Sequence, residues 1–468
     1  MANETIKPTG RMATPIDAAC GPIFAGERER IVPYHHMHGS PYCLPAFVPY
    51  TPDEVETLRQ ASETVDRIYR NVLRFVQRSL PDAFLVHRLG IPPAVAAAAR
   101  LEVPYHVLSR QDWLLGPEGP VWIENNTDTP TGVPETAYLT GSLISDYGAG
   151  YSNPSEGMDK CLQQALIDLV NHYRSMGMDG KLIFSSLDWQ EHAEDAANTA
   201  YVMEQARLAG LEAEFAPFGE LEVIADDGLY WRGERVGIWY RLYPLEFLAD
   251  DRDDEGYPIG EEVLRLAASG KLGLINPAQS AITQSKGFMA LLWSLAMESG
   301  SPDGIYPLAP DEAAFIRRYM PDTYWTPDPF IQSGTAYAAK SMWGREGKGT
   351  ALFGPDGKPL HADSEERVPD SNKMSKDTTD EEEDSKHYYE SQPKIYQRYV
   401  PMEHVLVPLP DGDMEGWLLT GVYAVGGRYG GLLPRIGGRI TGDLACFVPA
   451  ATIEQPAIGR VNGDDVRV

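Results

Sequence analysis

The sequence has no run of apolar residues that approaches the roughly 20 a membrane-spanning helix requires. Its first residues also lack the positive segment and apolar core of a signal peptide. The four cysteines are scattered and form no CxxC pair, which argues against a disulfide framework or a zinc site. Together these absences favour a cytoplasmic protein with reduced thiols.

Positive charge is also scarce, because 40 basic residues face 68 acidic ones and the net charge is −28. Nucleic acids and anionic membranes require a basic footprint on a protein, so neither is expected as a partner. Only 12 of the basic residues are lysines. Part of the acidity is local, since Glu381–Asp384 lies in a polar stretch at about 355–392. That composition is typical of a solvated, flexible insertion, with a lid or a partner contact as the functional alternative.

Several familiar catalytic patterns are missing. The chain has neither a Gly-x-Ser-x-Gly elbow nor a GxxxxGK[ST] phosphate loop. The cluster His35, His36 and His38 has no cysteine or carboxylate at ligand spacing, so surface polarity is the better interpretation than a metal site.

A chain of 468 residues is too long for one hydrophobic core, and we expect two or three packed units. Residues 1–50 show no periodicity and predict an irregular arm. Thr51-Pro-Asp-Glu54 predicts a capped helix start, and helical spacing then continues to about Leu80. Strand–helix–strand alternation after residue 180 predicts an α/β layer within 51–330, whereas 331–468 is richer in strands.

Two distant segments carry the chemistry. Arg110 and Asp112 precede a predicted turn at 116–119, and Glu124 and Asn126 alternate on the strand that follows. Such a hairpin places the oxygen atoms side by side, and oxygen ligands suit Mg²⁺. In isolation, however, the same residues also fit a satisfied polar edge.

The second segment places Lys340 on a predicted apolar strand, followed by the loop Gly344-Arg345-Glu346-Gly347. Glycines let backbone N–H groups approach an anion, so this loop is expected to fold over phosphates. Lys286 begins another predicted helix, where a phosphate would be stabilised. With the oxygen-rich hairpin, these features predict a Mg–ATP site, although each alone is also compatible with a surface lysine.

Taken in order, the motifs resemble the synthetase domain of the glutathionylspermidine synthase family, which is ATP-grasp-like. The resemblance extends from about Arg110 to Pro449. It rests on Arg110-x-Asp112 with Glu124-x-Asn126, Tyr243-Pro-Leu-Glu246, Ser285-Lys286-x5-Leu-Trp293, Lys340-x3-Gly-Arg-Glu-Gly347, Tyr396-Gln397, Val425-Gly-Gly-x-Tyr-Gly-Gly-x3-Arg435 and Phe447-Val-Pro449. It implies an α/β (α+β) fold with an ATP-grasp-like synthetase preceded by a pre-ATP-grasp region.

The resemblance also implies roles for individual residues. The implied Mg²⁺ ligands are Asp112, Glu124 and Asn126. The implied ATP contacts are Lys286, Lys340, Gly344, Arg345, Glu346, Gly347, Gln397, Arg398, Tyr399 and Val400. Arg110 resembles the arginine that stabilises the transition state, with Arg435 beside it. The implied substrate contacts are Thr131, Glu194, Asp195 and Glu246.

The sequence departs from the family pattern in three respects. No Cys-His amidase domain precedes the synthetase region. Asp195-Ala196 stands where the synthase has paired glutamates for glutathione, and the acidic insertion separates Gly347 from the adenine-contacting segment. The resemblance therefore implies an ATP-dependent ligase that joins a small carboxylate to an amine through an acyl phosphate, without naming either substrate. A nucleotide-binding protein without ligase activity and a small-molecule phosphotransferase remain the alternatives.

Overall fold

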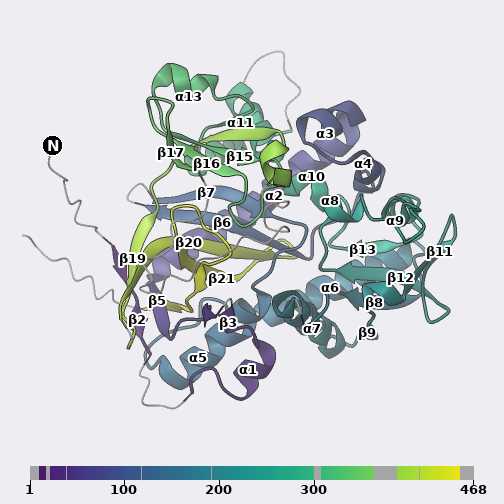
Figure 1. The fold of residues 1–468 in the computed structure, drawn as a ribbon, viewed down its shortest axis with the longest axis horizontal. Coiled ribbons are helices and arrows are strands. Elements are labelled where there is room, and N and C mark those ends of the chain that lie inside the picture. The colour runs from purple at the N-terminus through teal and green to yellow at the C-terminus, as the bar shows by residue number, and fades with distance from the viewer. Residues whose placement is uncertain are drawn as a thin grey trace, which may run out of the picture.

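The computed structural model describes residues 10–16, 22–37, 39–116, 119–190, 192–299, 307–362, 387–410 and 412–453. A central sheet, in which strands from distant parts of the chain pair, lies between two other layers of sheet and helix (Figure 1). No helix within these ranges is long and apolar enough to cross a bilayer. The acidic run Glu381–Asp384 and His38 lie outside the described residues.

A central sheet occupies the middle of the molecule. Its strands are β1 (Arg11–Met12), β6 (Leu108–Gly116), β7 (Gly119–Asn126), β19 (Glu403–Val407), β20 (Met414–Val425), β21 (Arg428–Gly437) and β22 (Cys446–Phe447). β20 pairs with β21 along one edge and with β19 and β6 along the other, all antiparallel. The sheet thus joins a hairpin from the first quarter of the chain to strands near its end.

The α/β layer lies to one side of the central sheet (Figure 1). Its sheet contains β8 (Lys181–Ser185), β9 (Ala213–Phe215), β10 (Leu221–Ile224), β11 (Gly228–Trp231), β12 (Glu234–Arg241) and β13 (Gly273–Ile275). The β8, β9, β12 and β13 pairings are parallel, as the alternating pattern predicts, while β10 and β11 form an antiparallel hairpin. β9 ends at Phe215, and a 3₁₀ turn, Phe218–Glu220, follows it before β10.

A smaller antiparallel sheet covers the other side. It contains β14 (Thr323–Tyr324), β18 (Lys394–Arg398), β15 (Tyr337–Ser341), β16 (Thr350–Phe353) and β17 (Pro359–Ala362), in that order. The helices nearest to it in the chain are α11 (Lys286–Glu298), α12 (Pro310–Tyr319) and α13 (Asp328–Ser333). Figure 1 shows this layer stacked over the β6–β7 hairpin.

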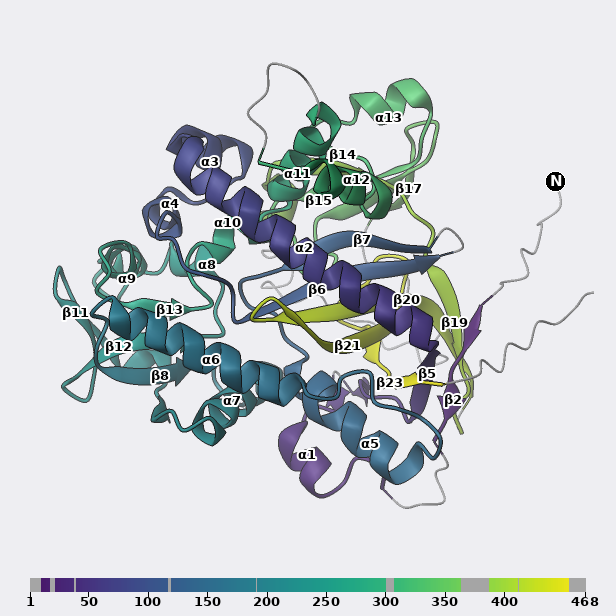
Figure 2. The ribbon, with the colours of Figure 1, turned by 180° about the vertical axis from the view of Figure 1, so that it is seen from behind.

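Long helices cover the rear of the molecule (Figure 2). α2 (Pro52–Ser79) begins at Thr51, whose side chain and Glu54 form the predicted capping box. α6 (Met158–Ser175) crosses the same face. The remaining helices are α1 (Glu27–Ile31), α3 (Asp82–Arg88), α4 (Pro93–Ala99), α5 (Thr140–Tyr147), α7 (Ala193–Leu208), α8 (Leu245–Leu248), α9 (Ile259–Ala268), α10 (Ser280–Gln284) and a π-helix, Glu135–Leu139.

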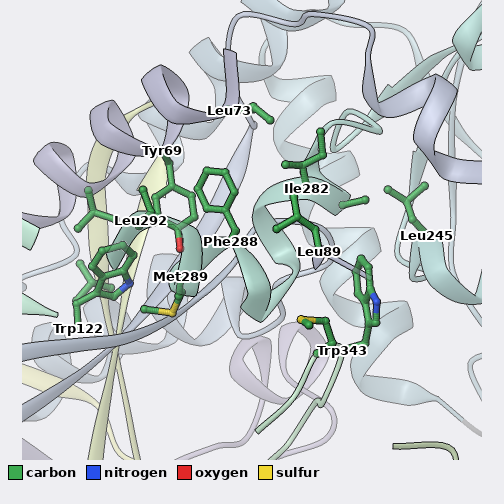
Figure 3. Close-up of a cluster of buried hydrophobic side chains, with 14 of the residues drawn as sticks. Tyr69, Leu73, Leu89, Trp122, Leu245, Ile282, Phe288, Met289, Leu292 and Trp343 are labelled. Carbon is green, nitrogen blue, oxygen red and sulfur yellow. The ribbon is translucent and has the colours of Figure 1, made fainter. Parts of the chain in front are cut away.

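The core joins these layers. Tyr69 of α2 packs against Trp122 of β7 and Phe288 of α11, with ring centroids 5.3 and 4.8 Å away. Figure 3 shows these side chains together with Leu292 and Met289 of α11. Large aromatic burial of this kind fixes α11, and hence Lys286 at its first turn, relative to the β6–β7 hairpin.

The N-terminal arm differs from the sequence expectation. Residues 10–50 are not irregular throughout, because β5 (Ala46–Tyr50) is buried between β2 (Thr14–Pro15) and β23 (Ala450–Thr452). A short hairpin of β3 (His36–Met37) and β4 (Ser40–Pro41) precedes it. The strands are short and their partners lie elsewhere in the chain, so the local sequence carries no periodic signal for them.

Candidate active site

The β6–β7 hairpin forms one wall of a cleft. Asp112 is paired in register with Glu124, and Arg110 with Asn126. Because side chains alternate along a strand, these four lie on the same face. The hairpin and its turn position match the expectation from sequence. Their roles toward a metal remain predictions.

The cleft contains about 1270 Å³ of empty space, part of it open solvent, between this hairpin, the smaller sheet and β21. Most of the predicted site residues line it: Arg110, Asp112, Glu124, Asn126, Thr131, Glu194, Lys340, Glu346, Gly347, Gln397, Arg398, Tyr399, Val400 and Arg435. Met37 and Tyr42 of the arm, and residues 439–443, line it as well. Sequence reasoning missed these because no motif marks them.

Asp112 is held between two arginines. Arg435 Nη2 donates to both carboxylate oxygens at 3.0 Å, and Arg110 Nε lies 3.4 Å from one of them. Burial opposes ionisation of Asp112, but the two guanidinium groups outweigh it and the pKa of this carboxyl is lowered. Arg110 Nη1 also donates to the carbonyl oxygen of Thr131 at 2.8 Å. Asp112 is therefore an anion that orients both arginines at the cleft.

The two predicted lysines approach the same hairpin from different elements. Lys340 on β15 donates to Gln397 Oε1 on β18 at 2.8 Å. Lys286, at the start of α11, donates to Glu124 Oε1 at 2.8 Å and to the carbonyl oxygen of Gly344 at 2.6 Å. Burial lowers the pKa of Lys340 to about 8, with the positive charge of Lys286 acting in the same direction and Glu124 opposing it.

The glycine loop connects β15 to β16, which pair as an antiparallel hairpin. Gly347 has φ +74°, and a Cβ atom there would lie 2.6 Å from Ile440 Cγ2, so this position requires glycine. Gly344 does not line the cleft, but its carbonyl oxygen accepts from Lys286. The loop therefore presents Glu346 and Gly347 to the cleft and is tied down behind them.

Five predicted residues do not line the cleft: Lys286 and Gly344, described above, and Arg345, Asp195 and Glu246. Arg345 turns away and donates to Glu246 Oε1 at 2.8 Å and to Thr129 Oγ1 at 3.1 Å. Glu246 is buried and forms an ion pair with Arg345, and the roles of these two residues toward a nucleotide and a substrate remain predictions. Asp195 lies next to the cleft residue Glu194, and burial raises its pKa to about 6.

Carboxylates gather at the end of the cleft nearest the arm. Burial and the negative charges of Glu135, Asp195 and Glu346 raise the pKa of Glu194 to about 8. Glu135, on the π-helix, is fully buried and accepts a hydrogen bond from Tyr42 at 2.9 Å. Sequence reasoning missed Glu135, which follows a proline-rich stretch without a recognisable spacing.

The opposite end of the cleft is apolar. Ala338, Leu352 and Ile440 form a small buried cluster with Tyr399 packed against it. All four line the cleft beside Val400. The wall of the cleft thus combines an apolar part that fits a flat ring, cationic side chains and a part rich in carboxylates.

The donor set fits a hard cation. No cluster of three or more His, Cys, Asp or Glu side chains arranged to hold a metal occurs among the described residues. The set that faces the cleft consists of Asp112, Glu124 and the amide of Asn126, all oxygen donors. Few protein ligands of this kind suit Mg²⁺, which keeps waters and substrate phosphates in its shell.

The protein thus has a mixed α/β fold and a cleft lined by apolar, cationic and acidic side chains. Residues 28–453 match the family model described as glutathionylspermidine synthase preATP-grasp, and the chain belongs to this family. That family comprises ATP-dependent carboxylate–amine ligases, which use ATP and Mg²⁺.

The chain was also compared with solved structures, and one of them shows a similar fold. A glutathione synthetase-like effector from Globodera pallida aligns with a TM-score of 0.51 and 10% identity, over 87% of this chain and 89% of that one. A protein described as a gamma-glutamylcysteine synthetase from Methylobacillus flagellatus aligns with a TM-score of 0.41 and 10% identity, over 83% and 84% of the two chains. At this identity, the first similarity speaks for the fold alone.

Proposed function

We propose that the protein is an ATP-dependent ligase that joins a small-molecule carboxylate to an amine through an acyl phosphate. The observation that carries the proposal is the convergence of Lys340, the arginine pair and the oxygen-rich hairpin on one cleft. Family membership supports the same reaction class. Glutathione and spermidine are not part of the proposal.

The nucleotide is proposed to lie with its base at the apolar end. Tyr399, Ala338 and Leu352 would enclose the ring, and the backbone of 397–400 would contact its edge. Lys340 would then meet the phosphates, with the Gly344–Gly347 loop above them. Asp112, Glu124 and Asn126 would hold Mg²⁺, which supplies neutralising charge to the phosphates when bound.

In the proposed reaction, an oxygen of the substrate carboxylate attacks the γ-phosphorus of ATP. The bond between the γ-phosphorus and the β–γ bridging oxygen breaks, and ADP leaves with that oxygen. The amine nitrogen then attacks the carbonyl carbon of the acyl phosphate, giving a tetrahedral oxyanion that expels inorganic phosphate. Arg110 and Arg435, already oriented by Asp112, would stabilise that oxyanion. Their preorganisation avoids rearranging charge during the step.

The acidic end suits the amine. An ammonium group must lose a proton before its nitrogen can attack. Glu194 lines the cleft, and its pKa is raised to about 8. This value is far closer to the pKa of an amine than the pKa of an ordinary carboxyl group is. We assign to Glu194 the role of accepting this proton, with Glu135 and Tyr42 supporting the end wall.

The first test is whether Mg–ATP binds and whether it is consumed. Purified protein is expected to gain thermal stability at millimolar Mg–ATP, as any native-state ligand produces. Phosphate release should then rise only when a carboxylate and an amine are both present, and mass spectrometry should find the amide. A folded protein that shows no thermal shift would contradict the proposal. A shift without stimulation by any acid–amine pair would favour a nucleotide-binding protein instead.

The second prediction concerns pH and Lys340. Its ammonium form prevails below pH 8 and is lost above it, because burial lowers its pKa to about 8. Nucleotide phosphates favour the charged form, so the dissociation constant for Mg–ATP is expected to rise as pH increases from 7.5 to 9.5. Calorimetric titration at several pH values measures this dissociation constant. Lys340→Gln should bind weakly throughout and lack this rise. An identical pH profile in both proteins would show that Lys340 does not carry the effect.

A further inference from the structure

A second hollow lies on the rear face, away from the cleft. It has about 760 Å³ of space open to solvent. Its walls come from α2, from residues 102–104 before β6, from the end of α6 and from Gln279 before α10. Figure 2 shows α2 and α6 crossing this face.

Arginines dominate one wall of this hollow. Arg70, Arg74 and Arg78 lie four residues apart on α2, and this spacing places them along one face of the helix. Arg70 donates to Asp66 at 2.8 Å, and Arg78 pairs with Glu102 through two hydrogen bonds of 2.5 and 2.6 Å. Three guanidinium groups therefore face two carboxylates, which leaves positive charge in a chain whose net charge is −28.

Two groups in the hollow lack protein partners. Arg74 makes no hydrogen bond or ion pair within the described ranges, although its charge lies near Glu102. The Nε2 atom of His172, at the end of α6, is buried and has no hydrogen-bond partner among these residues. Because Nε2 is shielded from solvent, Arg74 rather than His172 is the group that a ligand in the hollow would contact.

The floor of the hollow is rigid. Gln279 Oε1 accepts hydrogen bonds from Gln77 at 3.2 Å and from the backbone N–H of Val103 at 3.0 Å, while its Nε2 donates to the Val103 carbonyl oxygen at 2.9 Å. Gln77 and Gln279 are both buried. The arginines thus project from a helix, α2, that is hydrogen-bonded through Gln77 to the floor of the hollow.

We infer that this hollow is a binding site for a small polyanion, carrying either phosphate groups or several carboxylates, and that it is separate from the cleft. Arginine forks recognise both oxyanion classes through paired N–H donors. Two residues in the wall of the hollow are close in sequence to residues of the cleft. Val103 precedes β6, which carries Arg110, and Gln279 precedes Lys286 by seven residues. The inference does not depend on the proposed ligase reaction.

The experiment uses the full chain with EDTA and titrates pyrophosphate and citrate separately by calorimetry, at one ionic strength set with chloride. Pyrophosphate alone would indicate a phosphate-bearing ligand, and citrate alone a polycarboxylate. Binding of both would indicate general polyanion recognition. Each of these results supports the site only if Arg74→Ala weakens binding about tenfold or more, the scale of one hydrogen bond to a charged group.

The controls separate this site from other cationic regions. Arg59→Ala removes an exposed arginine on the same helix that pairs with Glu56, and it should leave the affinity unchanged. Lys340→Ala removes the proposed phosphate contact of the cleft, so it identifies any pyrophosphate bound there, and citrate affinity should be unchanged in this variant. Equal weakening by Arg74→Ala and Arg59→Ala would overturn the inference. So would complete loss of anion binding in Lys340→Ala, or no binding of either anion to the unmodified chain.

Discussion

Replacing Arg110 with alanine is expected to lower turnover by about a hundredfold or more while Mg–ATP binding stays close to that of the unmodified protein. The factor is the scale for losing one preorganised oxyanion donor. Arg110 is oriented by Asp112 and by the carbonyl oxygen of Thr131, and it lies on the hairpin rather than at the apolar end of the cleft. Its contribution should therefore appear in kcat more than in the affinity for the nucleotide.

The matched control is Lys340→Ala, at the part of the same cleft proposed for the nucleotide phosphates. The Lys340 side chain donates to Gln397, and its loss should raise the KM for ATP more than it changes kcat. Steady-state kinetics and calorimetry on both variants give the comparison. An Arg110→Ala protein that is folded, binds ATP and turns over normally would show that the catalytic assignment is wrong even though the family is right.

Asp128→Asn is expected to destabilise the protein by about 3–5 kcal/mol, the cost of leaving a buried charge without its partner. Asp128 and Arg241 form an ion pair of 2.6 Å in which both side chains are 0% exposed. Asp128 also accepts from the backbone N–H of Leu245 at 2.9 Å and from Ser280 at 3.0 Å. Asparagine keeps the shape but removes the charge that neutralises Arg241.

Asp146→Asn is the control, because Asp146 pairs with Arg28 at an exposed position. Its loss should cost no more than about 1 kcal/mol. Urea unfolding at constant m-value measures both. A similar small cost for the two variants would show that Asp128 does not neutralise Arg241. Asp128 also follows the predicted metal residues closely in sequence, so a variant of normal stability that loses Mg²⁺ dependence would reassign it to the metal.

Local patterns predicted the elements that carry the cleft. Strand alternation identified the hairpin of Asp112 and Glu124, the capping signal at Thr51 located α2, and the apolar run after Lys286 located α11. Each depends on residues close together in the chain, so the sequence contains the necessary information. The family resemblance is confirmed over residues 28–453.

What the sequence could not predict depends on pairs that are distant in the chain. Arg345 is aligned with a nucleotide-covering loop, yet it is neutralised by Glu246, 99 residues earlier. Glu135 becomes part of the acidic end only because Tyr42 of the arm reaches it. The arm itself forms a strand because residues near the other end of the chain pair with it. No periodicity or spacing reports such contacts.

The pairing of Val48 with Ala450 has a consequence for how the protein is made. During synthesis, β5 emerges from the ribosome long before its partner β23 has been made. In the same way, β6 is made long before its partner β20. The hairpin that carries Asp112 can form early, but Arg435 reaches it only after β21 has been synthesised. Pairings of such high sequence separation form slowly. The cleft therefore assembles long after its first hairpin has been made, and a nascent chain stopped before residue 435 has the hairpin without its second arginine.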